Sequence, residues 1–204
     1  MTVEHVEVLV EEPSMEAALL ALLPKLLGAI SFQIHAFQCK QELLRHLPAR
    51  LRAYRSWLPQ DWRILVLVDR DSEQCHAVKQ SLEDMARGAD LVTRSAAAGG
   101  PYVVLNRLAI EELEAWYFGD WQAVRAAYPR VIATIPAKQG YRNPDAIRGT
   151  WQAFERILRR SGYFRGGLRK VEAARSIARH MDPSRNTSYS FRIFANAVTE
   201  MTRS

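Results

Sequence analysis

The stretch that decides the fold is ILVLVDRD, at residues 64–71. Its first five residues are all apolar, which is typical of a strand that is buried on both faces. Such strands belong mostly to parallel sheets, in which helices cover both faces. Residues 64–68 therefore predict the central strand of a parallel α/β sheet, with an acidic turn at its carboxyl end.

Strands and helices alternate before and after this stretch. Residues 5–10 form a short β-rich run, and residues 31–36 alternate polar and apolar side chains. Apolar residues at helical spacing follow, over 14–23 and 41–57, and a third helix is expected over 72–87. This order predicts a Rossmann-like parallel sheet flanked by helices.

The second half of the chain is mainly helical. Two candidate strands come first, at 90–93 and 102–108. The expected helices then follow at 110–118, 120–128, 144–159, 168–180 and 189–201. We expect residues 1–120 to form the α/β core. Residues 121–204 are expected to form a helical, basic extension that packs on this core within one compact domain.

Composition excludes several classes of protein. Of the 204 residues, 48% are hydrophobic and 25% are charged, as in a globular domain and unlike a disordered or collagen-like chain. The longest apolar stretch, residues 17–30, contains Pro24, Lys25 and Gly28 and is shorter than the roughly 20 residues that span a membrane. Residues 1–12 contain four glutamates and do not resemble a signal peptide, which begins with a basic segment. We therefore expect a cytoplasmic protein without a membrane segment.

Neither the cysteines nor the aromatic residues indicate a separate site. Cys39 and Cys75 lie far apart without the paired spacing of zinc ligands, so we expect two core thiols. Trp116, Tyr117 and Trp121 have two interpretations, because they could stack on nucleic-acid bases or pack in the core. Their helical spacing favours the core.

Charge is distributed unevenly. The net charge of +6 combines −2 for residues 1–102 (11 basic, 13 acidic) with +8 for residues 103–204 (17 basic, 9 acidic). Most of the basic residues are arginines, which suit bidentate contacts with phosphate, so a polyanion such as nucleic acid is the leading partner. The alternative is a basic surface without a dedicated ligand. The candidate phosphate-binding residues are Lys138, Arg142, Arg165, Arg169, Lys170 and Arg175.

Carboxylates follow two of the predicted strands. Glu11 comes after the first strand, and Asp69 and Asp71 come after the central one. Ligands gather at the carboxyl ends of parallel strands, and three carboxylates that meet there would repel each other without a cation. The pattern therefore predicts a site for Mg²⁺ or Mn²⁺. Possible additional acidic ligands are Glu12, Glu16, Glu112 and Glu114.

At these residues the sequence resembles the Toprim fold, the metal-dependent catalytic domain of bacterial-type primases, topoisomerases and overcoming-lysogenization-defect nucleases. That family has a glutamate after its first strand and Asp-x-Asp after its third. More closely, VEEPSME at residues 10–16, DRD at 69–71 and ELEAW at 112–116 are similar to a Toprim-like bacterial family of unknown function. The likeness extends to the region around Lys170 and Arg175.

The resemblance implies a function. It implies a Mg²⁺-dependent nuclease or phosphotransfer protein that acts on nucleic acid, in which Glu11, Asp69 and Asp71 are the catalytic and metal-binding residues. Members of the family often accompany ABC-type ATPases in defence-type gene pairs, so an ATPase partner is also implied. One residue departs from the pattern, because Glu12 stands where Toprim proteins usually have glycine. A side chain there could crowd an approaching phosphate or add a ligand.

Other interpretations use the same residues. Asp71 or Ser72 could cap the third helix without any catalytic role. A haloacid-dehalogenase-type phosphatase also has Asp-x-Asp after a strand, but that strand normally opens the domain. A GT-A glycosyltransferase uses Asp-x-Asp to hold Mn²⁺, although 204 residues is short for one. The non-enzymatic alternative is a binding subunit of an ATPase complex.

Overall fold

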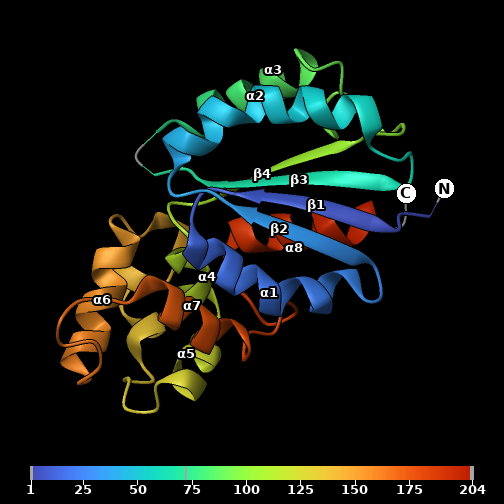
Figure 1. The fold of residues 1–204 in the computed structure, drawn as a ribbon. Helices are drawn as coiled ribbons and strands as arrows, with labels where there is room; N and C mark the ends of the chain where they lie inside the picture. Colours follow the sequence, from blue (N-terminus) through green and yellow to red (C-terminus); the bar gives the residue numbers. More distant parts are fainter. Residues whose placement is uncertain (1, 72, 203–204) are drawn as a thin grey trace.

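The computed structural model describes residues 2–71 and 73–202 and confirms the α/β class. Within these residues, four strands form one parallel sheet in the spatial order β2-β1-β3-β4 (Figure 1). Strands β1 and β3 therefore lie at its centre. The strands are β1 (His5–Val10), β2 (Ser31–Ala36), β3 (Trp62–Asp69) and β4 (Val104–Ala109).

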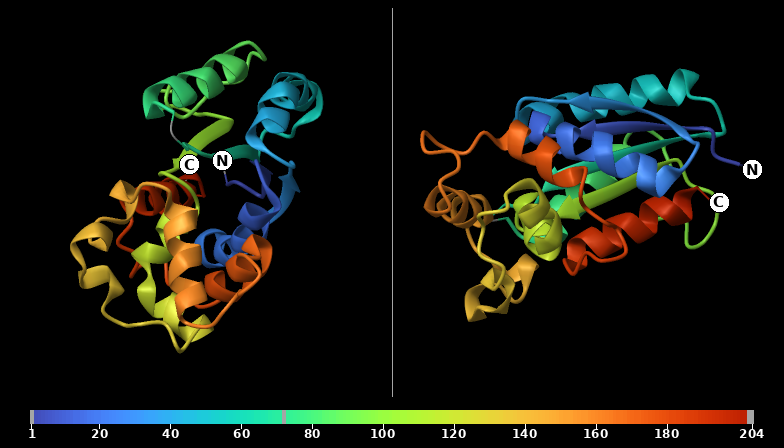
Figure 2. Two further views of the ribbon diagram at one scale, coloured as in Figure 1. Left: turned by 90° about the vertical axis from the view of Figure 1, so that its left-hand side faces the viewer. Right: turned by 90° about the horizontal axis from the view of Figure 1, so that it is seen from below.

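Helices cover both faces of the sheet. Figures 1 and 2 show α2 and α3 on one face, α1 and α8 on the other, and the smaller helices beyond α1. The first three helices are α1 (Pro13–Leu27), α2 (Lys40–Trp57) and α3 (Cys75–Arg87). The later ones are α4 (Glu114–Gly119), α5 (Trp121–Ala127), α6 (Thr150–Arg160), α7 (Lys170–Ala178) and α8 (Tyr189–Met201), with 3₁₀ turns at Ile135–Ala137, Gln139–Tyr141 and Pro144–Ala146.

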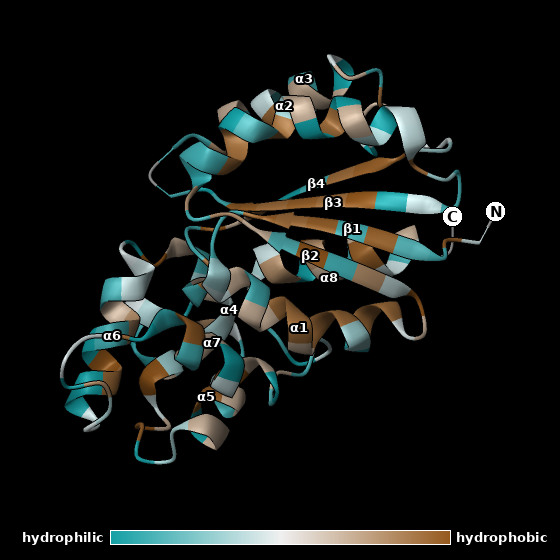
Figure 3. Cartoon of the chain, in the orientation of Figure 1, coloured by the Kyte–Doolittle hydropathy of each residue, from teal (hydrophilic) through white to brown (hydrophobic). Residues whose placement is uncertain are grey.

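Alternate residues of β3 enter two separate hydrophobic cores. Leu65 and Leu67 join the core beneath α1 and the C-terminal helices, whereas Ile64, Val66 and Val68 join the core beneath α2 and α3. All five are completely buried. Both faces of the strand thus need apolar side chains, which explains the uninterrupted run and the hydrophobic colour of most of β3 in Figure 3.

The C-terminal helices pack back onto the first half of the chain. Helix α7 packs against α1, and α8 packs against β4 and α1. Trp116, Tyr117 and Trp121 are buried in the same core as α1, so the prediction of core packing is confirmed. The proposed boundary at residue 120 stays a prediction.

Some expected elements differ in the structure. In the region 90–93, only Thr93 pairs, through an isolated parallel bridge to Val104. The helix expected over 144–159 is interrupted, because Gly149 adopts a left-handed conformation (φ 59°) and α6 begins after it. Both cysteines are exposed, so the expectation of core thiols was wrong. They lie at the N-terminal ends of α2 and α3, outside the packed faces of these helices.

No helix in the described part of the chain is long and apolar enough to cross a membrane.

Candidate metal site at the carboxyl edge of the sheet

Three carboxylates meet where the two central strands end. Strands β1 and β3 are paired in register, so Glu11 follows β1 beside the place where Asp69 ends β3. Asp71 follows two residues later. One carboxylate oxygen from each of the three residues lies within 4.8 Å of the others. The structure therefore brings together the three residues that the sequence predicted as metal ligands.

The backbone around β3 holds this arrangement. The Glu11 Oε2 atom accepts a hydrogen bond from the Asp69 N–H group at 3.0 Å. Asp71 has a left-handed backbone (φ 55°), and its N–H group donates to the carbonyl of Glu111 at 2.8 Å. Helix α3 begins at Cys75 with Gln74 as N-cap, so Asp71 does not cap it, and Ser72 lies outside the described residues.

Burial makes the two innermost carboxylates unusually hard to ionise. Glu11 is 6% exposed and Asp69 is 2% exposed. Burial raises the pKa of the Glu11 carboxyl to about 7, although the hydrogen bond from Asp69 opposes this shift. Burial, and then the charges of Glu11 and Glu114, raise the pKa of Asp69 well above its usual range. The Asp69 Oδ1 atom is buried and has no hydrogen-bond partner among the described residues.

Glu12 and Glu114 extend the acidic cluster. Glu114 opens α4 and is 2% exposed, and its Oε2 atom has no hydrogen-bond partner in the described part of the chain. Burial raises the pKa of Glu114 to about 7, against the effect of Lys170. The carboxylate of Glu12 lies 3.5 Å from the Lys170 ammonium and also accepts a hydrogen bond from Ser14. Both glutamates raise the pKa of Asp69, so they belong to the same electrostatic unit.

Glu112 and Glu16 are placed differently. The Glu112 Oε2 atom accepts a hydrogen bond from the Trp151 N–H group at 2.9 Å, at the start of α6. The neighbouring Glu111 accepts one from Gly149 N–H at 2.8 Å. These two glutamates thus bind orphan amides at a helix N-terminus. Glu16 lies in the first turn of α1 and is not one of the described carboxylates that meet at the site.

Lys40 contacts the site, although the sequence analysis missed it. It is 7% exposed at the start of α2, and its Nζ atom donates to Asp71 Oδ2 at 2.6 Å and to Glu73 Oε1 at 2.8 Å. Burial lowers the pKa of Lys40, but the two carboxylates outweigh this effect and raise it. A signal was available, because Lys40 follows β2, whose carboxyl end lies at the same edge of the sheet.

Of the six basic residues predicted to bind phosphate, Lys170 is the one that contacts the acidic cluster. Burial disfavours its charge, but Glu114 and Glu12 raise its pKa. Arg169 instead pairs with Glu172 at 2.9 Å, and Arg142 donates to the Ala137 carbonyl. The other three side chains, Lys138, Arg165 and Arg175, are exposed.

The fold and the site together define an α/β protein with a buried acidic cluster at the carboxyl edge of its parallel sheet. The chain belongs to the family described as domain of unknown function DUF4276, whose model matches residues 10–199. This match includes all the candidate acidic ligands and phosphate-binding residues, from Glu11 to Arg175. Neither a curated protein nor a solved structure matches the chain.

Proposed function

We propose that Glu11, Asp69 and Asp71 bind a divalent cation, Mg²⁺ or Mn²⁺, and that the protein hydrolyses phosphodiester bonds of nucleic acid. The convergence of these three carboxylates within 4.8 Å carries the proposal. Mg²⁺ and Mn²⁺ prefer oxygen ligands such as carboxylates, and these three residues would hold the ion together. The unpartnered Asp69 Oδ1 atom supplies an oxygen that no other described group uses.

Each residue of the site has its own proposed role in catalysis. A bound cation would neutralise the scissile phosphate and lower the pKa of a coordinated water. Asp69 and Asp71 would hold it, and Lys40 would orient the Asp71 carboxylate through their 2.6 Å ion pair. Glu11 would be the third ligand, and without a bound cation its pKa of about 7 suits it to accept or donate a proton at neutral pH. Lys170, whose ammonium lies 3.5 Å from the Glu12 carboxylate, would attract a phosphate.

The resemblance to Toprim proteins supports the same assignment. The resemblance rests on a glutamate after the first strand and Asp-x-Asp after the third, and Glu11, Asp69 and Asp71 stand at the ends of β1 and β3. On this basis we also propose that the protein is the effector of an ABC-type ATPase in bacterial defence. The ATPase would then gate cleavage, and activity of the isolated chain would be low.

Nicking of supercoiled plasmid DNA tests the proposal. We expect slow nicking by the purified protein with Mn²⁺ or Mg²⁺, no nicking with EDTA, and loss of nicking in Asp69→Asn. Glu16→Gln is the matched control, because it removes a nearby carboxylate that lies outside the cluster, and it should retain activity. Nicking that persists at the wild-type rate in Asp69→Asn would contradict the proposal.

A non-catalytic binding subunit is the second candidate. Two ion pairs favour it, because the ammonium of Lys40 pairs with Asp71 and that of Lys170 pairs with Glu12. These ion pairs could make the acidic cluster a structural element. In that case Mn²⁺ would not stabilise the protein. A metal site predicts that Mn²⁺ raises the melting temperature of the wild-type protein and not that of Asp69→Asn.

A further inference from the structure

One face of α6 presents a row of arginines. Arg156, Arg159 and Arg160 are spaced i, i+3 and i+4, so they share one side of the helix. The opposite side, which includes Phe154 and Leu158, is completely buried in the core. The buried face fixes the orientation of α6, and the arginines are therefore held at the surface as a group.

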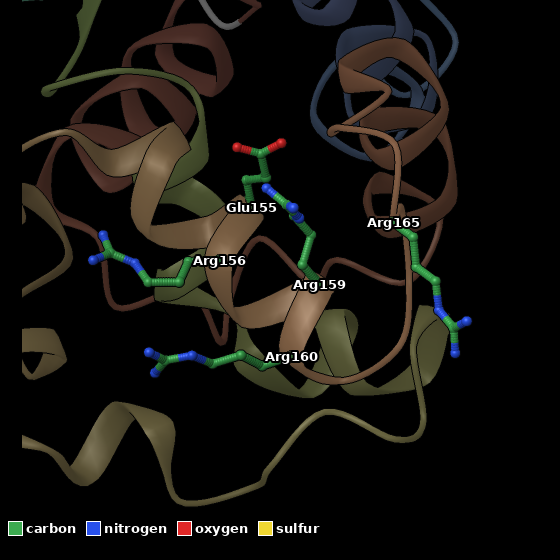
Figure 4. Close-up of a pocket in the computed structure, with 5 residues that line it drawn as sticks. All are labelled: Glu155, Arg156, Arg159, Arg160 and Arg165. Atoms are coloured by element: carbon green, nitrogen blue, oxygen red, sulfur yellow. The ribbon is translucent and has the colours of Figure 1, made fainter.

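These arginines line a surface pocket together with Arg165. The pocket has a volume of about 420 Å³, and its remaining lining residue is Glu155. Figure 4 shows Arg156 and Arg160 extending to the same side of α6, whereas Arg165 comes from the loop after the helix. The Glu155 Oε1 atom accepts a hydrogen bond from the Leu168 N–H group at 3.0 Å, which holds this carboxylate toward the loop.

The four guanidinium groups lack protein partners. None of them forms an ion pair or a hydrogen bond with another residue in the described part of the chain. Two other arginines contrast with them, because Arg169 pairs with Glu172 and Arg185 pairs with Asp120. Glu155, towards which Arg159 extends in Figure 4, is the one carboxylate among the lining residues against four arginines, so an external anion is the natural counter-charge for the remaining positive charge.

The pocket lies along α6 from the acidic cluster. The first turn of α6 contacts Glu112 through the bond from Trp151 N–H, and Glu112 lies two residues before Glu114 of the acidic cluster. At 1.5 Å per residue, Arg156 and Arg160 lie about 7 and 14 Å further along the helix. The phosphates of one strand are spaced by about 3.4 Å along a duplex, so a strand that crosses the acidic cluster would carry several phosphates past these arginines.

We propose that Arg156, Arg159, Arg160 and Arg165 bind the phosphodiester backbone of nucleic acid and align it with the carboxylates of the sheet edge. The identity of the ligand rests on the proposed function. Arginine forks bind phosphate oxygens in bidentate fashion, and such contacts position a strand without reading its bases. Binding through this pocket is therefore independent of sequence.

The test measures binding of a fluorescein-labelled 20-base-pair DNA duplex in EDTA over a series of salt concentrations. The triple variant Arg156→Glu, Arg159→Glu, Arg160→Glu should weaken binding at least tenfold at low salt. It should also reduce the log–log salt slope by up to about 2.7, at roughly 0.9 per lost phosphate contact. The milder Arg→Gln triple variant serves if charge reversal prevents folding, and it should weaken binding in the same direction.

A matched control removes the effect of total charge. Arg45→Glu, Arg52→Glu, Arg55→Glu makes the same change, from +6 to 0, on exposed positions of α2, which covers the opposite face of the sheet. It should retain most of the affinity and of the slope. Equal losses in both triple variants, or unchanged binding in the α6 variant, would overturn the inference.

Two further measurements separate this inference from the proposed function. Asp69→Asn should bind the duplex in EDTA as tightly as wild type does, because its arginines are intact. If wild type neither binds Mn²⁺ nor nicks DNA while duplex binding still depends on α6, the proposed function fails and the inference stands. If wild type nicks DNA while the α6 variant binds the duplex unchanged, the inference alone fails.

Discussion

Asp69 combines the deepest burial of the three predicted ligands with an unused oxygen. It is 2% exposed, and its Oδ1 atom has no hydrogen-bond partner among the described residues. A carboxylate in such a place is costly unless a cation or a proton compensates its charge. Two predictions at the scale of single residues follow from this cost.

The first prediction concerns the melting temperature of Asp69→Asn. Free Mn²⁺ at about ten times its Kd should stabilise wild type by roughly 1.4 kcal/mol, a rise of about 3 to 6 °C for a chain of this size. Asp69→Asn should melt no lower than wild type in EDTA, because it removes a buried carboxyl that is costly to ionise, and should lose most of the Mn²⁺ effect. An equal Mn²⁺ shift in both proteins would exclude the proposed site.

The second prediction concerns pH. Glu11 and Glu114 have a pKa near 7 in the folded protein instead of 4.5, so the folded state binds more protons than the unfolded state between these values. The free energy of unfolding in EDTA should therefore fall as the pH rises from 5 to 8, by on the order of 1–3 kcal/mol per group. Mn²⁺ requires charged carboxylates, so its stabilising effect should grow over the same range.

Urea denaturation at a series of pH values, with EDTA or with Mn²⁺, measures both trends. Glu11→Gln should reduce the dependence on pH in EDTA, because one of the two titrating carboxyls is gone. A wild-type stability that is constant from pH 5 to 8 in EDTA would contradict the assignment of raised pKa values to Glu11 and Glu114.

At the scale of elements, residues 110–113, which follow β4, accept hydrogen bonds from the start of α6. Glu112 accepts a hydrogen bond from Trp151 N–H, a group that has no partner within the helix. Glu112→Ala should therefore lower the free energy of unfolding by about 0.5–2 kcal/mol, the usual cost of a lost N-cap. The stabilisation by Mn²⁺ should stay unchanged, because this carboxylate serves α6.

Thermal unfolding with and without Mn²⁺ checks both parts of this prediction. Glu172→Ala is the matched control, since Glu172 forms an exposed pair with Arg169 that should contribute less than about 1 kcal/mol. Loss of the Mn²⁺ effect in Glu112→Ala would instead make Glu112 a ligand, as the sequence analysis allowed.

At the scale of the whole molecule, Asp120 joins segments that are far apart in the chain. Its fully buried side chain caps α5 through Ala123 N–H and accepts a hydrogen bond from Asp182 N–H at 2.8 Å. It also forms a bidentate pair with Arg185, at 2.8 and 2.9 Å. The link holds the segment before α8 against the helices that follow β4.

Asp120→Asn should lower the free energy of unfolding by about 3 kcal/mol, because it breaks a buried pair while the rest of the network stays in place. Asp182→Asn provides the comparison, since Asp182 is 47% exposed and lies 3.9 Å from Arg185. Its change should remain within about 1 kcal/mol. Chemical denaturation of both variants measures the difference, and equal effects would contradict the role given to Asp120.

Much of the fold could be predicted from local patterns. The run at 64–68 indicated a strand covered on both faces, and alternate residues do enter two cores. The helix boundaries after residue 140 were harder to predict, because Gly149 and the glutamates that bind the start of α6 interrupt a continuous helical pattern. Cys39 and Cys75 are exposed because they lie at the N-terminal ends of α2 and α3, outside the packed faces of these helices.

The sequence by itself determined the parallel α/β class and the gathering of Glu11, Asp69 and Asp71, because carboxyl ends of neighbouring parallel strands share one edge of a sheet. Tertiary structure alone decided which other charges reach that edge. Lys40 and Lys170 come from helices whose placement depends on how whole helix faces pack. The same packing brings Glu112 against the start of α6 and leaves the arginines that line the α6 pocket at the surface. Local spacing states which residues share an element, whereas contacts between elements depend on buried surfaces that form only when the entire chain has folded.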